Sequence, residues 1–214
     1  REQHIKRERA TSNICTAQAL LAMAAGFYAV FHGPKELIRI ARRIHELTRF
    51  LNDKLRNCGY KQFNKYFFDT LKIELPKADN ALAERINESA LASEINFRYF
   101  EDGSVGISLD ETTSIRDVWD IVEIFAGASG IVVKAVDQIE ILNDGPLTYP
   151  DELTRRSSFL THTIFNTHHS ETQMMRYLRS LKIKDIGLDT SMIPLGSCTM
   201  KLNAAAEMTP VTWS

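Results

Sequence analysis

The stretch Ile95-Asn96-Phe97-Arg98-Tyr99-Phe100-Glu101-Asp102-Gly103-Ser104-Val105-Gly106-Ile107-Ser108-Leu109 contains two runs in which apolar residues alternate with other residues. An Asp-Gly pair lies between the runs, and this pair suits the tight turns that join antiparallel strands. The stretch therefore predicts a β-hairpin. Its first strand covers residues 95–100, and Val105, Ile107 and Leu109 mark its partner.

Elements on both sides of this hairpin complete a small α/β unit. Residues 67–75 predict a strand, because Leu71-Lys72-Ile73-Glu74-Leu75 alternates cleanly before Pro76 ends the run. Apolar residues at helical spacing predict a helix over 82–91 and another from Thr113-Ser114 to Gly127. The order strand, helix, strand, strand, helix predicts a two-layer α/β domain over residues 64–130.

Helical patterns flank this domain in the chain. Apolar residues repeat at helical spacing over 17–31 and again over 34–57, and His32-Gly33-Pro34 separates the two predicted helices. Residues 1–63 are therefore expected to be helical. Residues 131–158 are predicted to form a linker, because turn-forming residues replace the periodic spacing of apolar residues there. A capping box at Ser170-Glu171-Thr172-Gln173 predicts a further helix within 159–214.

Composition and charge exclude several classes of protein. Hydrophobic residues make up 44% and charged residues 25%, as in ordinary globular domains. No apolar run reaches the ~18 residues of a membrane span, so no membrane partner is expected. Three widely spaced cysteines predict neither a disulfide framework nor a metal site. Residues 84–144 carry 13 acidic and 4 basic side chains, which argues against a nucleic-acid partner.

The run Ser191-Met192-Ile193-Pro194-Leu195-Gly196-Ser197-Cys198-Thr199-Met200-Lys201-Leu202-Asn203 has the composition of a functional loop. It combines hydroxyl, thiol, ammonium and amide groups with a proline and a glycine that shape the backbone. Loops of this kind often carry binding and catalytic residues. The candidate site residues are Ser191, Ser197, Cys198, Thr199, Lys201 and Asn203, with His169, Asn13 and Cys15 as secondary candidates.

Five of these candidates have more than one interpretation. The sequence favours a packed or gating thiol at Cys198 over a nucleophile, because no histidine lies near it in the sequence. Lys201 could meet a phosphate, a carboxylate or a Schiff-base carbonyl, or form a plain surface ion pair. His169 is consistent with helix-start chemistry, as are Asn13 and Cys15. Physical chemistry alone gives no reaction for this chain.

Three stretches of the sequence resemble the P-protein family of the glycine cleavage system. They are residues 1–22, which include Thr11-Ser12-Asn13-Ile14-Cys15-Thr16-Ala17-Gln18; His169-Ser170-Glu171-Thr172; and residues 191–213. The resemblance implies a fragment of a pyridoxal-phosphate enzyme with the aspartate-aminotransferase fold (fold type I). In that fold, residues 1–63 would end the large domain of an N-terminal half, and 64–130 would be its small domain. After the linker, residues 159–214 would begin the cofactor-bearing C-terminal half.

The reaction implied by the resemblance is the decarboxylation of glycine, followed by transfer of the aminomethyl group to lipoylated H-protein. In the family, the lysine that holds the cofactor as a Schiff base lies in a His-Lys motif, and this chain contains no His-Lys pair. The loop's Lys201 does not match it. The fragment alone is therefore expected to be inactive and not to bind pyridoxal phosphate.

The resemblance also implies partners and a compartment. The partners would be glycine, the H-protein and the remainder of the P-protein, in a homodimer or a two-subunit dimer. The compartment would be the cytoplasm in a bacterium or the mitochondrial matrix in a eukaryote. An alternative from another class is a structural or oligomerisation module in which no residue contacts substrate.

Overall fold

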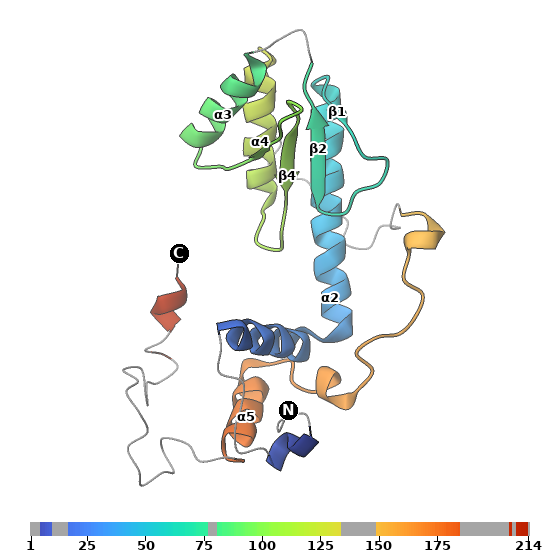
Figure 1. Cartoon of the computed structure of the whole chain (residues 1–214), viewed down its shortest axis with the longest axis vertical. Coiled ribbons are helices and arrows are strands. Elements are labelled where there is room, and N and C mark those ends of the chain that lie inside the picture. The colour runs from blue at the N-terminus through green and yellow to red at the C-terminus, as the bar shows by residue number, and fades with distance from the viewer. Residues whose placement is uncertain are drawn as a thin grey trace. The chain divides into compact units, whose positions relative to one another are not determined.

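The computed structural model describes residues 5–9, 17–76, 81–133, 149–184, 206 and 209–213. The chain divides into two units. The sheet unit comprises Lys35–Ser158, and the helical unit comprises Arg1–Pro34 together with Phe159–Ser214. Figure 1 shows the elements of both units.

A four-stranded antiparallel sheet forms one layer of the sheet unit. Its strands are β1 (Lys61–Gln62), β2 (Thr70–Glu74), β3 (Arg98–Tyr99) and β4 (Val105–Ser108), in the spatial order β1-β2-β4-β3. The predicted hairpin is confirmed: β3 pairs with β4, and the Phe100 N–H donates to the Ser104 carbonyl at 3.0 Å. Gly103 takes a φ of 80° in the turn.

Both predicted strands before the hairpin turn are shorter than expected, and β1 was not predicted. Lys61 and Gln62 have no apolar alternation, so β1 exists only through its pairing with β2. Within β2 the prediction of alternation is confirmed. Leu71 and Ile73 are buried, whereas Thr70 is exposed. One face of the sheet is therefore covered and the other is open.

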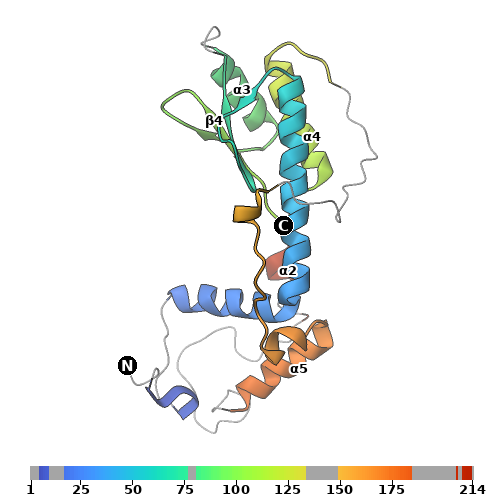
Figure 2. The same ribbon diagram turned by 90° about the vertical axis from the view of Figure 1, so that its right-hand side faces the viewer.

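Helices α3 (Leu82–Ala92), α4 (Ile115–Ala128) and the second part of α2 (Ala17–Asn57) form the other layer. Leu47, Leu51 and Leu55 of α2 are 0–1% exposed and belong to the same core as the sheet. The ring centroids of Phe50 and Trp119 lie 5.5 Å apart where α2 meets α4, and Figure 2 shows these two helices from the side. The sheet unit consequently begins at Lys35, earlier than residue 64.

Polar contacts hold α4 at both ends. At its start, Ser114 and Asp117 form the reciprocal hydrogen bonds of a capping box, which confirms the predicted start. At its end, the Tyr60 hydroxyl donates to the Phe125 carbonyl at 2.7 Å and lies 2.6 Å from the Ser129 hydroxyl. These contacts satisfy main-chain groups that a helix end leaves without partners.

The path of α2 is interrupted at Gly33, whose φ of 65° and ψ of 178° are not helical. Pro34 follows and has no N–H to offer to a continuing helix. The predicted boundary between two helices at His32-Gly33-Pro34 is confirmed. None of the helices in the described part of the chain combines the length and the apolar character needed to cross a membrane.

In the helical unit, α5 (Glu171–Lys182) begins where the sequence predicts. The Gln173 N–H donates to the Ser170 hydroxyl at 3.3 Å. The predicted capping box is wrong in its second half, because the Gln173 side chain accepts from the N–H of His169 instead of Ser170. The short helices are η1 (Arg7–Arg9), η2 (Asp151–Leu153), η3 (Thr163–Asn166) and η4 (Thr209–Thr212).

Candidate functional site

Most of the predicted site residues lie outside the described residues. These are Ser191, Ser197, Cys198, Thr199, Lys201, Asn203, Asn13 and Cys15. His169 is described, and it lies in the helical unit directly before the start of α5.

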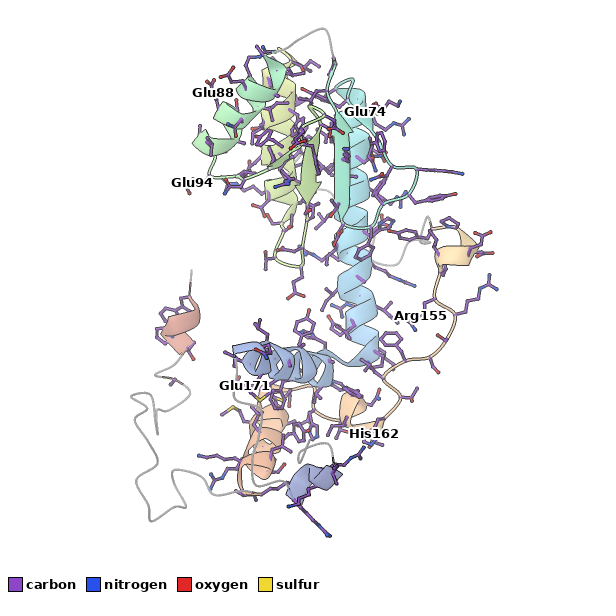
Figure 3. The ribbon with its side chains drawn as sticks, in the orientation of Figure 1. Glu74, Glu88, Glu94, Arg155, His162 and Glu171 are labelled. Atoms are coloured by element: carbon purple, nitrogen blue, oxygen red, sulfur yellow. The ribbon has the colours of Figure 1, made fainter. Side chains whose placement is uncertain are left out.

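The chain reaches His169 through a tightly bonded turn around η3. The side-chain N–H groups of Asn166 donate to the carbonyls of Leu160 and His162, each at 3.0 Å. The His162 Nδ1 accepts from the Ile164 N–H at 3.2 Å. Figure 3 labels His162 beside η3 and Glu171 at the start of α5. The turn is followed in the chain by that helix. These bonds stabilise the turn that precedes His169 in the chain.

The His169 ring binds the end of the first part of α2. Its Nδ1 lies 2.7 Å from the carbonyl oxygen of Phe31. A carbonyl can only accept, so Nδ1 carries the proton, and in the neutral ring Nε2 holds the lone pair. Phe31 is in the last turn before Gly33, where helix carbonyls have no partner inside the helix. His169 therefore supplies a side-chain cap from a distant part of the sequence.

Gly33 makes this contact possible. A Cβ atom at this position would lie 2.5 Å from the Phe165 carbonyl oxygen and 2.7 Å from Cε1 of His169. The positive φ adds a conformational reason for glycine. The Gly33 backbone and the His169 ring are thus in direct contact, with no room for a side chain between them.

A hollow of about 340 Å³ lies beside this contact. His168 stacks on Tyr177 with ring centroids 4.4 Å apart, and Tyr177 meets Phe27 edge-on at 6.3 Å. The lining residues are Thr167, His168, Gln173, Arg176, Tyr177 and Ser180. No lysine is among these described residues, so the hollow does not fit pyridoxal phosphate held as a Schiff base.

Chemically, the His169 arrangement is suited to positioning. Nδ1 is committed to a main-chain carbonyl, and the adjacent N–H is bound by Gln173. The ring therefore fixes the first turn of α5 against α2. Within the described ranges, no group of histidine, cysteine and carboxylate side chains could hold a metal ion.

The sequence did not predict a second, smaller hollow in the sheet unit. His45, Arg49, Asn52 and Asp53 line one side of it, and Lys65, Tyr66, Phe67 and Tyr149 complete it. The four helical residues lie at positions i, i+4, i+7 and i+8, so they share one face of α2. This spacing of polar side chains along the helix was the available signal in the sequence.

Comparisons with known proteins point to one family. A family model described as "Glycine cleavage system P-protein" matches residues 1–125. Glycine dehydrogenase (decarboxylating) of Paraburkholderia xenovorans strain LB400 is 52% identical over 216 residues, which cover 100% of this chain and 22% of that protein. The protein of the same name from Bacteroides fragilis strain YCH46 is 52% identical over 212 residues, covering 99% and 22%.

A third relative is glycine dehydrogenase (decarboxylating) 2 of Pseudomonas putida strain KT2440. It is 52% identical over 214 residues, which cover 100% of this chain and 22% of that protein. The chain thus spans 22% of the length of each of these curated relatives.

Proposed function

Because this chain belongs to the glycine cleavage system P-protein family, we propose that it forms part of an enzyme that decarboxylates glycine. The enzyme would pass the remaining aminomethyl group to lipoylated H-protein. The observation that carries this proposal is the 52% identity that extends over the whole chain to glycine dehydrogenases (decarboxylating).

The cofactor of the intact enzyme would be pyridoxal phosphate, whose ring takes up the electron pair released as carbon dioxide leaves. The lysine that holds it would lie outside residues 1–214, because the chain has no His-Lys pair. The lysine-free lining of the hollow beside His168 agrees with this placement. The chain alone would neither hold the cofactor nor turn over glycine.

The contribution of this chain would be a wall of the active site. In the loop 191–203, the hydroxyls of Ser197 and Thr199 and the ammonium group of Lys201 can bind a carboxylate such as that of glycine. The remaining candidates in the loop are Ser191, Cys198 and Asn203. His169 would act as a positioning residue, since its ring fixes the start of the helix that precedes the loop in sequence.

Alanine substitution in the full-length protein tests this role. We expect Lys201→Ala to lower kcat/KM for glycine at least tenfold, the loss of about one charge-assisted hydrogen bond. Lys184→Ala is the matched control, because Lys184 is an exposed lysine that follows α5, and we expect its kinetics to be unchanged. If Ser197→Ala, Cys198→Ala and Lys201→Ala all leave turnover unchanged, the loop has a structural role.

One observation favours a second role, as an oligomerisation or docking module. Leu20, Leu21 and Met23 on the first part of α2 are 68%, 73% and 54% exposed. Contiguous exposed apolar surface of this kind commonly marks an interface. Light scattering of the 214-residue chain tests the role: self-association that Leu21→Glu abolishes supports it, whereas a monomer at high concentration contradicts it.

A further inference from the structure

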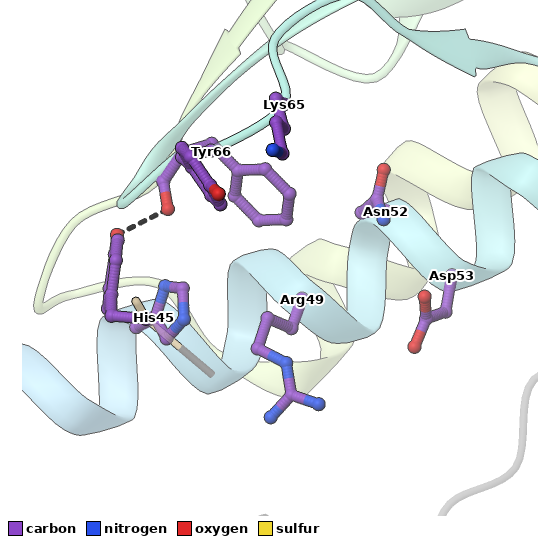
Figure 4. A pocket seen from close by; sticks show the side chains of 8 residues that line it. His45, Arg49, Asn52, Asp53, Lys65 and Tyr66 are labelled. Atoms are coloured by element: carbon purple, nitrogen blue, oxygen red, sulfur yellow. Dashed lines mark hydrogen bonds between the residues drawn. The ribbon is translucent and has the colours of Figure 1, made fainter. Parts of the chain in front are cut away.

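The hollow on α2 of the sheet unit has the features of a small binding site. Figure 4 shows His45, Arg49, Asn52 and Asp53 on the helix, with Lys65 and Tyr66 on the segment that faces it. Its volume is about 110 Å³. That is room for about four water molecules, and hence for a ligand with few non-hydrogen atoms.

One end of the hollow is built rigidly from aromatic rings. His45 is 3% exposed, and its Nδ1 lies 3.0 Å from the Phe68 carbonyl oxygen. Tyr149 stacks on the His45 ring with centroids 4.5 Å apart and donates its hydroxyl proton to the Phe67 carbonyl. Burial raises the pKa of the Tyr149 hydroxyl, with Asp69 as a smaller cause. This end therefore forms a fixed aromatic wall.

The other lining groups carry both signs of charge. Arg49 uses only Nη1 to bind Glu46, at 3.0 and 3.1 Å, and its other N–H groups form no hydrogen bond with the described residues. Lys65 adds a second cation, with its Nζ 5.0 Å from the centre of the Tyr66 ring. Asp53 adds an anion. A ligand with a single charge would therefore meet an unfavourable group as well as a favourable one.

The hollow is also lined by Asn52, which carries a buried hydrogen-bond acceptor. The side-chain oxygen Oδ1 of Asn52 is buried and has no hydrogen-bond partner among the described residues. Buried polar atoms of folded proteins nearly always have a partner, so a lone one in a hollow points to a ligand or to water. An unpartnered oxygen acceptor suits an N–H donor with positive charge, and the Asp53 carboxylate in the same lining adds an anionic group.

We propose that this hollow binds a small α-amino acid as a zwitterion. The ligand carboxylate would bind the available N–H groups of Arg49, with Lys65 as a second cation, and the ammonium group would bind Asn52 and Asp53. The volume limits the ligand to the size of glycine, alanine or serine. This inference does not rest on the proposed reaction, and its test measures binding instead of turnover.

The test is a titration of the 214-residue chain with glycine, followed by NMR of the Asn52 side-chain amide and the His45 ring. We expect saturable shifts at both groups in the millimolar range. Acetate and methylamine carry one charge each, and we expect each to bind at least about tenfold more weakly than glycine, since each loses one set of charge-assisted hydrogen bonds. Acetate binding as tightly as glycine would show an anion site and overturn the proposal.

Two variants locate the binding. Arg49→Gln should weaken glycine binding at least about tenfold. Arg39→Gln is its matched control, because Arg39 forms the same i, i+3 ion pair with Glu36 and does not line the hollow. If Arg49→Gln fails to fold, as judged by circular dichroism, Asp53→Asn replaces it with the same expected loss. The absence of saturable shifts, or equal affinity in the lining variant and the Arg39 control, would overturn the proposal.

Discussion

The Nδ1 atom of His169 lies 2.7 Å from the carbonyl oxygen of Phe31, a residue 138 positions earlier in the chain. This bond joins two stretches that are separated by the whole sheet unit in sequence. It also explains why residue 33, just before Pro34, is a glycine. The His169 ring occupies the space that a side chain at this position would need. A specific polar contact between residues far apart in the sequence thus helps to stabilise the helical unit.

The first prediction concerns Gly33. We expect Gly33→Ala to lower the free energy of unfolding by about 2 kcal/mol or more, because a Cβ atom would clash with Phe165 and His169 at a positive φ. Gly26→Ala is the control, since nothing lies within 4 Å of a Cβ there and the residue is inside a helix. The control should be stabilised by up to about 1 kcal/mol. Chemical denaturation of both variants measures the difference, and equal stability would contradict the close approach.

The second prediction concerns the end of α4. Tyr60→Phe removes the hydroxyl that binds the Phe125 carbonyl and Ser129, and Tyr60 is 4% exposed. We expect a loss of about 1–2 kcal/mol, because the buried carbonyl loses this donor. Tyr66→Phe is the matched control, since Tyr66 is 47% exposed, and it should change stability by less than about 0.5 kcal/mol. A loss confined to Tyr66→Phe would show that the contact at Phe125 is not stabilising.

The third prediction concerns acid and the hairpin turn. A hydrogen bond from Lys72, together with bonds from Ser104, holds the pKa of the Asp102 carboxyl well below its usual range. A carboxyl whose pKa is lowered by folding stabilises the folded state above its unfolded pKa, which is about 3.9. That stabilisation is lost as the pH falls from there towards the folded-state pKa.

Unfolding in urea at neutral and acidic pH measures this effect. We expect the wild type to lose more stability than Asp102→Asn as the pH falls below about 4. Lys72→Gln should move the pKa of Asp102 back towards its usual range, which carboxyl NMR can follow. Identical pH profiles for the wild type and Asp102→Asn would refute the role of this carboxylate.

Local patterns in the sequence were enough to predict the elements whose signals are short-range. The alternation in β2, the turn at Asp102-Gly103 and the cap at Ser114 each depend on a few neighbouring residues, and the structure confirms all three. Strand β1 could not be predicted, because Lys61 and Gln62 are ordered only by pairing with β2.

The site was less predictable, because its contacts join residues far apart in the chain. Nothing in the sequence near His169 indicates that its ring binds Phe31 or that Gln173 binds the His169 N–H. The hollow on α2 needs Tyr149, which is distant from His45 in sequence. The loop residues Ser191, Ser197, Cys198, Thr199, Lys201 and Asn203 stay predictions, since they lie outside the described residues.

The most direct test of the proposed function is to locate the lysine that holds the cofactor. The full-length protein would be loaded with pyridoxal phosphate, reduced with borohydride and digested, and the modified lysine identified by mass spectrometry. We predict a lysine outside residues 1–214, directly after a histidine. Modification of Lys201, or of any other lysine of this chain, would contradict the account.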